Sequence, residues 1–176
     1  MLNSTTCRCL ALALITAAAV ACGGSSPPST ERTPPDLAAF LRLPVATPSA
    51  CPAGSNGTGS GRLSPWAGHV DISVFIADSA DAATRKALHD ALVAAAHVAH
   101  VYTESRAQAY EEFQRLYTCS AGVPRSVVRA SYRLVVDNST TTPQRDALVR
   151  QIYRLPGVGD VSCDPVSPCV GVGRSS

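Results

Sequence analysis

The sequence is poor in several kinds of residue, and each shortage narrows the class of protein. Of the 15 basic residues in the 176-residue chain, only Lys86 is a lysine. The basic residues are scattered and the net charge is only +2, which argues against a nucleic-acid partner. Aromatic residues make up only 5%, so the core must consist of Val, Leu, Ile and many alanines. Because alanine buries little area, a small domain of this kind would benefit from covalent staples.

Long apolar runs are also missing, apart from one near the N-terminus. Residues 10–21 are apolar except for Thr16, and twelve helical residues span roughly 18 Å. A hydrocarbon core of about 30 Å is too thick for that run to cross, whereas the apolar region of a signal peptide has this length. No later segment is long enough to span a membrane.

The apolar run ends in the segment Ala19-Val20-Ala21-Cys22-Gly23-Gly24. This segment resembles the lipobox of bacterial lipoproteins, in which small residues precede a cysteine that is lipidated and becomes the new N-terminus. Cys22 is therefore the expected lipidation site, and residues 1–21 form the expected lipoprotein signal peptide. An ordinary signal peptide cleaved near Ala21 is the alternative. A lipidated Cys22 would anchor the chain at the extracytoplasmic face of the cell membrane.

Composition divides the rest of the chain into a tether and a folded domain. Residues 22–65 contain two stretches rich in Gly, Ser, Pro or Thr, residues 23–35 and 52–61, which bury too little apolar surface to order themselves. We expect a flexible tether and loop there, with one or two helical turns over residues 36–43. The folded domain is expected over residues 66–176.

The folded domain carries an internal duplication. The first copy contains an alternating strand through Phe75, a helix with apolar spacing through Leu88, and a second strand over residues 98–103. At an ungapped offset of 60 residues (135 − 75), Phe75 aligns with Val135 and Leu88 with Leu148. Two βαβ units predict an α+β fold, the ferredoxin-like split βαβ arrangement, with a four-stranded sheet and helices on one face.

An extra helix is expected between the two copies. Ser105 and Gln108 have the spacing of a capping box, with Gln in place of Glu. The apolar stripe that follows consists of Ala109, Phe113, Leu116 and Tyr117, with Tyr110 beside it.

Other residues mark the helix ends in the two copies. Asp78 or Ser79 is the expected cap of the first copy's helix. In the second copy, Thr142 is the expected cap, with Pro143 at the first helical position and Gly157 able to take a left-handed conformation after the helix.

Six short segments of the domain match a known family in their order and spacing. They are Val74–Ile76, Ala83–Leu88, Val98–Val101, Ser105–Phe113, Ala130–Val135 and Leu155–Val158. Together they resemble the extracellular domain of FtsX, the membrane permease-like subunit of an ABC-type complex in bacterial cell division. The resemblance spans about residues 70–163 and covers almost all of the expected domain.

The resemblance implies a module that binds another protein outside the cytoplasm. In the family, the region between the middle helix and the third strand forms a small helical lobe whose exposed apolar residues engage peptidoglycan hydrolases or their activators. Here that region is short, and Val128-Arg129 stands where the family usually has Leu-Pro. FtsX itself spans the membrane, whereas no segment of this sequence after the N-terminal apolar run is long enough to do so. The resemblance therefore implies a stand-alone, lipid-anchored domain rather than a permease.

The middle helix carries the candidate partner-binding residues, which are Tyr110, Phe113, Leu116 and Tyr117. They either cover the sheet, which is the simpler interpretation for Phe113 and Leu116, or present aromatic surface to a partner, as amphipathic Tyr110 and Tyr117 would. From the resemblance, we expect that partner to be a peptidoglycan hydrolase or its regulator.

Four cysteines follow the expected signal peptide and lipidation site: Cys51, Cys119, Cys163 and Cys169. In an oxidising compartment their even number favours two disulfides, and three pairings are open. A metal site is the alternative, but the sequence has no second close pair beside Cys163 and Cys169.

Two histidines, His97 and His100, also lie close together in the sequence. Gly157 and Asp160 take their places in the second copy, so we expect an edge turn with solvated histidines rather than metal ligands.

No nucleophile-elbow or phosphate-loop motif is present. We therefore expect a non-enzymatic binding module of the cell envelope without metal or cofactor, linked by resemblance to cell division and peptidoglycan remodelling. One alternative is a small-ligand or sensory lipoprotein, which a deep apolar pocket with convergent polar groups would favour. Another is a redox protein that uses Cys163 and Cys169 as an easily reduced disulfide.

Overall fold

The computed structural model describes residues 34–44, 58–59, 62–118, 120 and 123–163. Its centre is a four-stranded antiparallel sheet with the strand order β3-β5-β2-β6. The strands are β2 (Ile72–Ile76), β3 (Val98–Glu104), β5 (Ser131–Val136) and β6 (Val158–Cys163). This order interleaves the two βαβ units, because β5 lies between β2 and β3, and β2 lies between β5 and β6. The predicted α+β, ferredoxin-like fold is confirmed.

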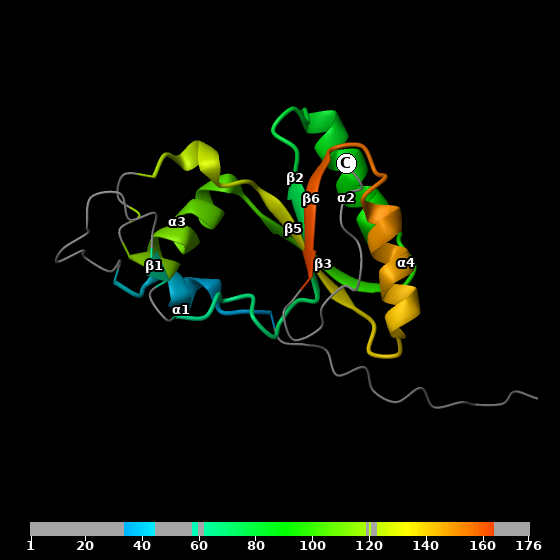
Figure 1. Cartoon of the computed structure of the whole chain (residues 1–176), viewed down its shortest axis with the longest axis horizontal. Coiled ribbons are helices and arrows are strands. Elements are labelled where there is room, and N and C mark those ends of the chain that lie inside the picture. The colour runs from blue at the N-terminus through cyan, green and yellow to red at the C-terminus, as the bar shows by residue number, and fades with distance from the viewer. Residues whose placement is uncertain (1–33, 45–57, 60–61, 119, 121–122, 164–176) are drawn as a thin grey trace, which may run out of the picture.

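The helices lie on both sides of the sheet. In Figure 1, α2 (Ala82–Val93) and α4 (Thr142–Ile152) lie to the right of the sheet, whereas α3 (Arg106–Leu116) and α1 (Leu37–Leu41) lie to its left. The smaller elements are the paired strands β1 (Thr58–Gly59) and β4 (Tyr117–Thr118) and the 3-10 turn η1 (Arg125–Val127). The two copies predicted helices on one face of the sheet, and α2 and α4 lie together on one side as expected. The extra helix α3 lies on the opposite side.

The duplication is visible in the element bounds. At the offset of 60 residues, the first residue of α2 corresponds to that of α4 (142 − 82), and the first residue of β3 to that of β6 (158 − 98). Even an unusual backbone conformation repeats, because His97 and Gly157 have φ angles of 71° and 86°. The predicted edge turn at His97 is therefore present in both copies.

The predicted helix caps are displaced by one to three residues. Asp81 caps α2 by accepting from the Thr84 amide at 2.7 Å, because a turn closed by Ala80 N–H to Ala77 O at 3.0 Å comes first. Thr141 rather than Thr142 caps α4, so Pro143 takes the second helical position. The expected caps Asp78, Ser79 and Thr142 were wrong because local propensity does not show how many residues the turn uses.

The main core lies between the sheet and the α2/α4 side. Alternate strand residues point into it, and so do the apolar stripes of both helices. Its most deeply buried members are Ile72, Val74, Leu88, Leu92, Leu134, Val136, Val149 and Ile152. Each large aliphatic side chain contributes about 1.5–3 kcal/mol of transfer free energy, so leucine, valine and isoleucine supply the core despite the scarcity of aromatic residues.

The opposite face of the sheet is more polar and has a different cover. Ser73, Phe75 and Arg133 point to this side by strand alternation. A smaller apolar cluster of Trp66, Val70 and Val135 covers part of it, with Leu37 and Tyr102 packed at its margin. The segment before β2 and the helix α3 thus form a second layer over this face.

None of the helices within the described ranges has the length and apolar character needed to cross a membrane.

Candidate functional site

The helix α3 begins and ends on local signals. The Ser105 hydroxyl accepts from the Gln108 amide, and the Gln108 side chain bonds back to the Ser105 amide, which confirms the predicted capping box. The helix stops at Tyr117, whose backbone is extended (φ −118°, ψ 121°) and pairs with Gly59. This abrupt end leaves the Tyr117 side chain 39% exposed at the edge of the second layer.

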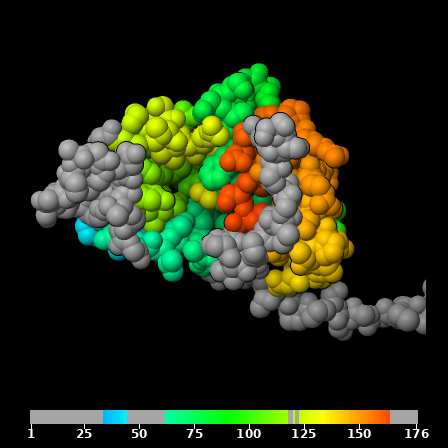
Figure 2. Space-filling model, viewed as in Figure 1, coloured from blue at the N-terminus to red at the C-terminus, as the bar shows by residue number. Residues whose placement is uncertain are grey.

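Two adjoining hollows lie between α3, the segment before β2 and the polar face of the sheet. One has a volume of about 390 Å³ and is bounded by Trp66 and Val70 on one side and by Ser162 and Cys163 of β6 on another. The other, of about 220 Å³, is lined by Phe75, Phe113 and Arg129 among others. Leu116, Tyr117 and Arg133 line both hollows, and we call the combined feature the α3 groove. Figure 2 shows the surface hollowed between the yellow-green atoms on the α3 side and the red-orange atoms of β6.

Three of the four predicted partner-binding residues meet in this groove. Phe113 and Tyr117 stack with ring centroids 4.8 Å apart, and Leu116 lies beside them. Tyr110 lies elsewhere, because its hydroxyl donates to the Val123 carbonyl at 2.8 Å and the Arg125 guanidinium lies 5.4 Å from its ring centre. Tyr110 thus holds the η1 segment, whereas the other three line the groove.

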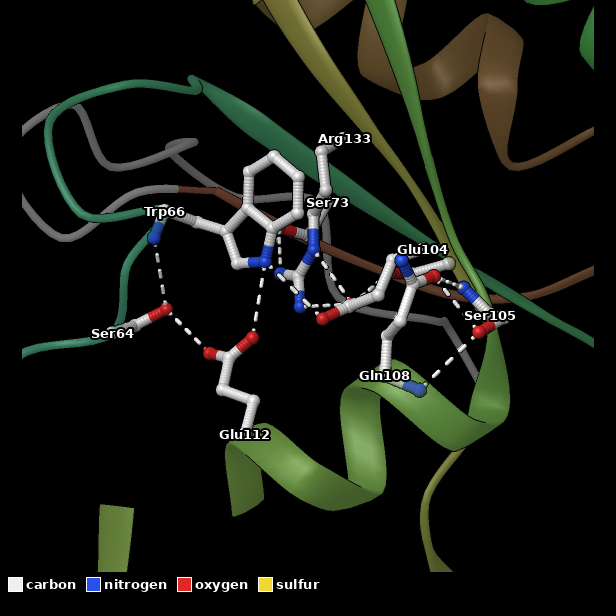
Figure 3. A network of polar contacts seen from close by, with 9 residues as sticks. Ser64, Trp66, Ser73, Glu104, Ser105, Gln108, Glu112 and Arg133 are labelled. Atoms are coloured by element: carbon white, nitrogen blue, oxygen red, sulfur yellow. Dashed lines mark hydrogen bonds and ion pairs between the residues drawn. The ribbon is translucent and has the colours of Figure 1, made fainter. Parts of the chain in front are cut away.

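A buried polar network closes the inner wall of the groove (Figure 3). Glu104 at the end of β3 is 2% exposed and Glu112 of α3 is 7% exposed. The Trp66 indole N–H donates to both carboxyl groups, at 3.2 Å to Glu104 and 3.0 Å to Glu112. The Ser64 hydroxyl donates to Glu112 at 2.6 Å. The network therefore connects α3, the segment before β2 and the sheet through side chains alone.

Arg133 of β5 supplies the positive charge of this network. Its guanidinium bonds the Glu104 carboxylate at 2.6 Å and 3.1 Å, and a third nitrogen donates to the Ser73 hydroxyl at 2.6 Å. The guanidinium carbon lies 5.5 Å from the Trp66 ring centre and 5.7 Å from that of Phe75. The Ser131 hydroxyl also donates to Glu104, at 2.6 Å. The one guanidinium therefore bonds the carboxylate of Glu104 and lies close to two aromatic rings.

The two acids differ in pKa because their surroundings differ. Burial, followed by the hydrogen bond and charge of Glu104, raises the pKa of Glu112 from 4.5 to about 7. Burial also acts to raise the pKa of Glu104. The charge of Arg133 and the hydrogen bonds from Glu112, Ser131 and Arg133 outweigh it, so this pKa falls below its ordinary value. Between the two pKa values, Glu104 is ionised and Glu112 holds a proton that it shares with Glu104.

A pair of acids with separated pKa values resembles the acid and base of a hydrolase. Here, however, all four carboxyl oxygens of the pair accept hydrogen bonds from this chain's own Ser64, Trp66, Ser131 and Arg133. The arrangement therefore serves to join two layers of the domain, and we call these two acids with Trp66 and Arg133 the carboxyl joint.

The carboxyl joint is not predicted by the sequence patterns. In a helical pattern Glu111 and Glu112 both look like solvent-facing residues, yet only Glu111 is exposed. One signal was available, because a buried tryptophan needs an acceptor for its N–H and Trp66 is the chain's only tryptophan. The identity of the acceptor depends on contacts between residues 38 and 46 positions apart, which local periodicity does not encode.

The remaining candidate residues are placed as follows. His100 stacks on Tyr102 with ring centroids 4.2 Å apart. Among the described residues, no group of three His, Cys, Asp or Glu side chains lies in reach of a common metal ion. Cys163 ends β6 as a disulfide-bonded residue. Cys22, Cys51, Cys119 and Cys169 lie outside the described ranges, so the pairing and the lipidation site stay predictions.

Comparison with known proteins gives one family. Residues 69–165 match the model of the FtsX extracellular domain, and no curated protein matches the chain. The matched stretch, 97 residues (165 − 69 + 1) of 176, is more than half of the chain and runs from just before β2 to just after β6. The chain therefore belongs to the FtsX extracellular domain family, whose domain is an extracytoplasmic, membrane-associated module of cell division.

Proposed function

We propose that this member of the FtsX extracellular domain family is a non-enzymatic, lipid-anchored binding module, which captures a peptidoglycan hydrolase or its regulator in the α3 groove. The observation that carries the proposal is the groove itself, where Phe113, Leu116 and Tyr117 line a hollow open to solvent. Aromatic side chains at the edge of a hollow are the groups that contribute most to protein–protein affinity.

Protein binding fits the groove better than catalysis does. Its apolar lining comes from the end of α3, the segment before β2 and Phe75, whereas its acidic groups are bonded to each other and to the chain's own donors. A catalytic acid needs an oxygen or proton within reach of the substrate, and both acids here are almost fully buried.

A small ligand is less well supported by the same reasoning. The polar groups that line the groove include Ser64, Ser73, Glu104, Glu112 and Arg133, and they bond one another: Ser73 to Arg133 at 2.6 Å, Arg133 to Glu104 at 2.6 Å and Ser64 to Glu112 at 2.6 Å. A ligand site would instead present polar groups that converge on an empty volume.

Anchoring at Cys22 would allow the domain to capture a partner even if its intrinsic affinity is low. A lipid at Cys22 confines the domain to a thin layer outside the membrane, and a partner held in the same layer meets it at high effective concentration. The α3 groove then needs only a low intrinsic affinity to hold its partner.

Site-specific photocrosslinking in living cells tests the proposal. A photoreactive phenylalanine analogue replaces Tyr117 in the full chain, and a second chain carries it at Val93. Val93 is the matched control because it is an apolar residue of α2, 56% exposed on the other side of the sheet. We expect the Tyr117 position to crosslink to a wall hydrolase or its regulator, and the Val93 position not to do so.

A Leu116→Asp substitution in the crosslinking chain completes the test. A carboxylate in the groove should reduce the crosslinked product about tenfold, because an unpaired charge would have to be desolvated on binding. If Tyr117 and Val93 give the same products, or if the Leu116→Asp chain crosslinks as before, the groove does not bind the partner.

A further inference from the structure

The carboxyl joint is short of positive charge. Glu104 and Glu112 together would carry two negative charges, and within the described ranges Arg133, which bonds Glu104, is the one cation that acts on the pair. One proton on the pair brings the joint to neutrality. Because both acids are almost fully buried, a second unpaired negative charge would be costly there.

The charged and hydrogen-bonding side chains around Glu112 come from β3, β5 and the segment before β2. Glu104 of β3 and Arg133 of β5 are the charged ones in contact with the joint. The segment before β2 contributes only the neutral donors Ser64 and Trp66. Across the smaller hollow, Tyr117 and Arg129 complete the lining.

The nearby arginines are directed to other partners. The Arg129 guanidinium lies 3.7 Å from the Asp78 carboxylate. Arg115 of α3 donates to the carbonyls of Leu41 and Leu43, at and just after the C-terminal end of α1. Arg62 donates to the Pro44 carbonyl at 2.9 Å. None of these three arginines is directed at the pair, so a proton neutralises the negative charge of the second carboxylate.

We infer that the carboxyl joint is a proton-operated latch on the α3 groove. With the shared proton in place, α3 and the Trp66 segment are held against the sheet and the groove has the shape described above. Loss of the proton sets two carboxylates against each other and releases this layer from the sheet. The inference rests on the proposed function only in assigning the groove to partner binding, since the latch itself is a property of the domain.

The direction of the pH effect follows from the two acids. Because the folded state holds the Glu112 proton up to about pH 7 while an unfolded glutamate loses it near 4.5, stability falls as the pH rises through this interval. Glu104 acts oppositely, since its pKa is lowered, but its contribution is lost only below the ordinary value of 4.5. Above that value Glu112 decides the outcome, so the latch opens on the alkaline side.

Trp66 reports the latch directly, because its indole donates to both acids and it is only 3% exposed. We would measure quenching of its fluorescence by acrylamide in the purified full chain at about pH 5.5 and about pH 8.5, on either side of the pKa of Glu112. In the wild type we expect the quenching constant to rise about threefold or more at the higher pH as the layer opens.

Two substitutions separate the latch from a general loss of stability. Glu112→Gln keeps the shape of the protonated acid, one acceptor oxygen and an N–H donor toward Glu104, and it has no proton to lose, so its quenching should stay low at both pH values. Glu111→Gln is the matched control, since this neighbour is exposed, and it should behave as the wild type does. The ¹³C carboxyl resonance of Glu112 in the wild-type chain should also titrate near pH 7, which needs no variant.

Equal quenching of the wild type at both pH values would overturn the latch, as would a Glu112→Gln chain that opens like the wild type. Neither result depends on a partner. A working latch without a crosslinked hydrolase would contradict only the proposed function, and a crosslinked hydrolase without a pH transition would contradict only the latch.

Discussion

Gly157 follows α4 and enters β6 with a φ angle of 86°, a conformation that L side chains rarely adopt. A Cβ atom there would also lie 2.8 Å from the Thr84 methyl group of α2. We predict that Gly157→Ala lowers the free energy of unfolding by about 3 kcal/mol, the sum of backbone strain and overpacking. Urea denaturation of the full chain measures this loss.

Gly68 is the matched control for that substitution. Its φ angle is 74°, but a Cβ atom there would meet no other atom within 4 Å. Gly68→Ala should therefore cost only the backbone term, about 1 kcal/mol. Equal losses at the two glycines would show that the approach of Thr84 to Gly157 has no energetic weight.

The residue scale is also where prediction from the sequence reached its limit. The spacing of Ser105 and Gln108 predicted their hydrogen bonds because both residues lie within one helical turn. Glu104 and Glu112 gave no such signal, although they line the inner wall of the groove, because their partners come from two distant segments, residues 64–66 and β5. Local rules describe caps and stripes, whereas a buried charge is explained only by what the fold brings to it.

At the scale of elements, α1 depends on α3. A helix of five residues does not persist alone in water. Its C-terminal carbonyls are bonded by Arg115, which reaches Leu41 O at 2.5 Å and Leu43 O at 3.2 Å. We predict that Arg115→Gln accelerates amide hydrogen exchange at Phe40 and Arg42 about tenfold, because α1 then loses its attachment.

Arg150→Gln provides the comparison, since Arg150 is an exposed arginine in the last turn of α4. Exchange in α1 should be unchanged in that variant. Unchanged exchange at Phe40 and Arg42 in the Arg115→Gln chain would show that α1 is held by other contacts.

The elements of the sheet were predicted well because each copy repeats the same local pattern. Apolar alternation in β2 and β5 and helical spacing in α2 and α4 point to one shared core, and the structure buries these residues together. The position of α3 was not predicted, because an amphipathic stripe tells which side of a helix is buried but not which face of a sheet buries it.

For the whole molecule, the two faces of the sheet have separate tasks. The α2/α4 side is a continuous apolar core that maintains the fold. The α3 side contains the groove, the carboxyl joint and the helix α1 through which the chain enters the domain. Cys22 lies 14 positions before Asp36, the cap of α1 (36 − 22), so the extended chain between them reaches at most about 50 Å. A lipid at Cys22 would therefore keep Asp36, where the chain enters the groove side of the domain, within about 50 Å of the membrane.

If Cys22 carries the proposed lipid, the location of the whole molecule depends on this residue. We predict that Cys22→Ser prevents incorporation of an alkyne-labelled fatty acid and moves the chain from the membrane fraction to the soluble fraction, because no lipid then retains it. Cys51→Ser is the matched control and should leave both labelling and membrane association unchanged, since Cys51 follows the expected lipidation site. A Cys22→Ser chain that is still labelled or still sediments with membranes would contradict the lipid anchor. It would also remove the reason to place the groove near the membrane, while the groove's own binding would remain testable by crosslinking at Tyr117.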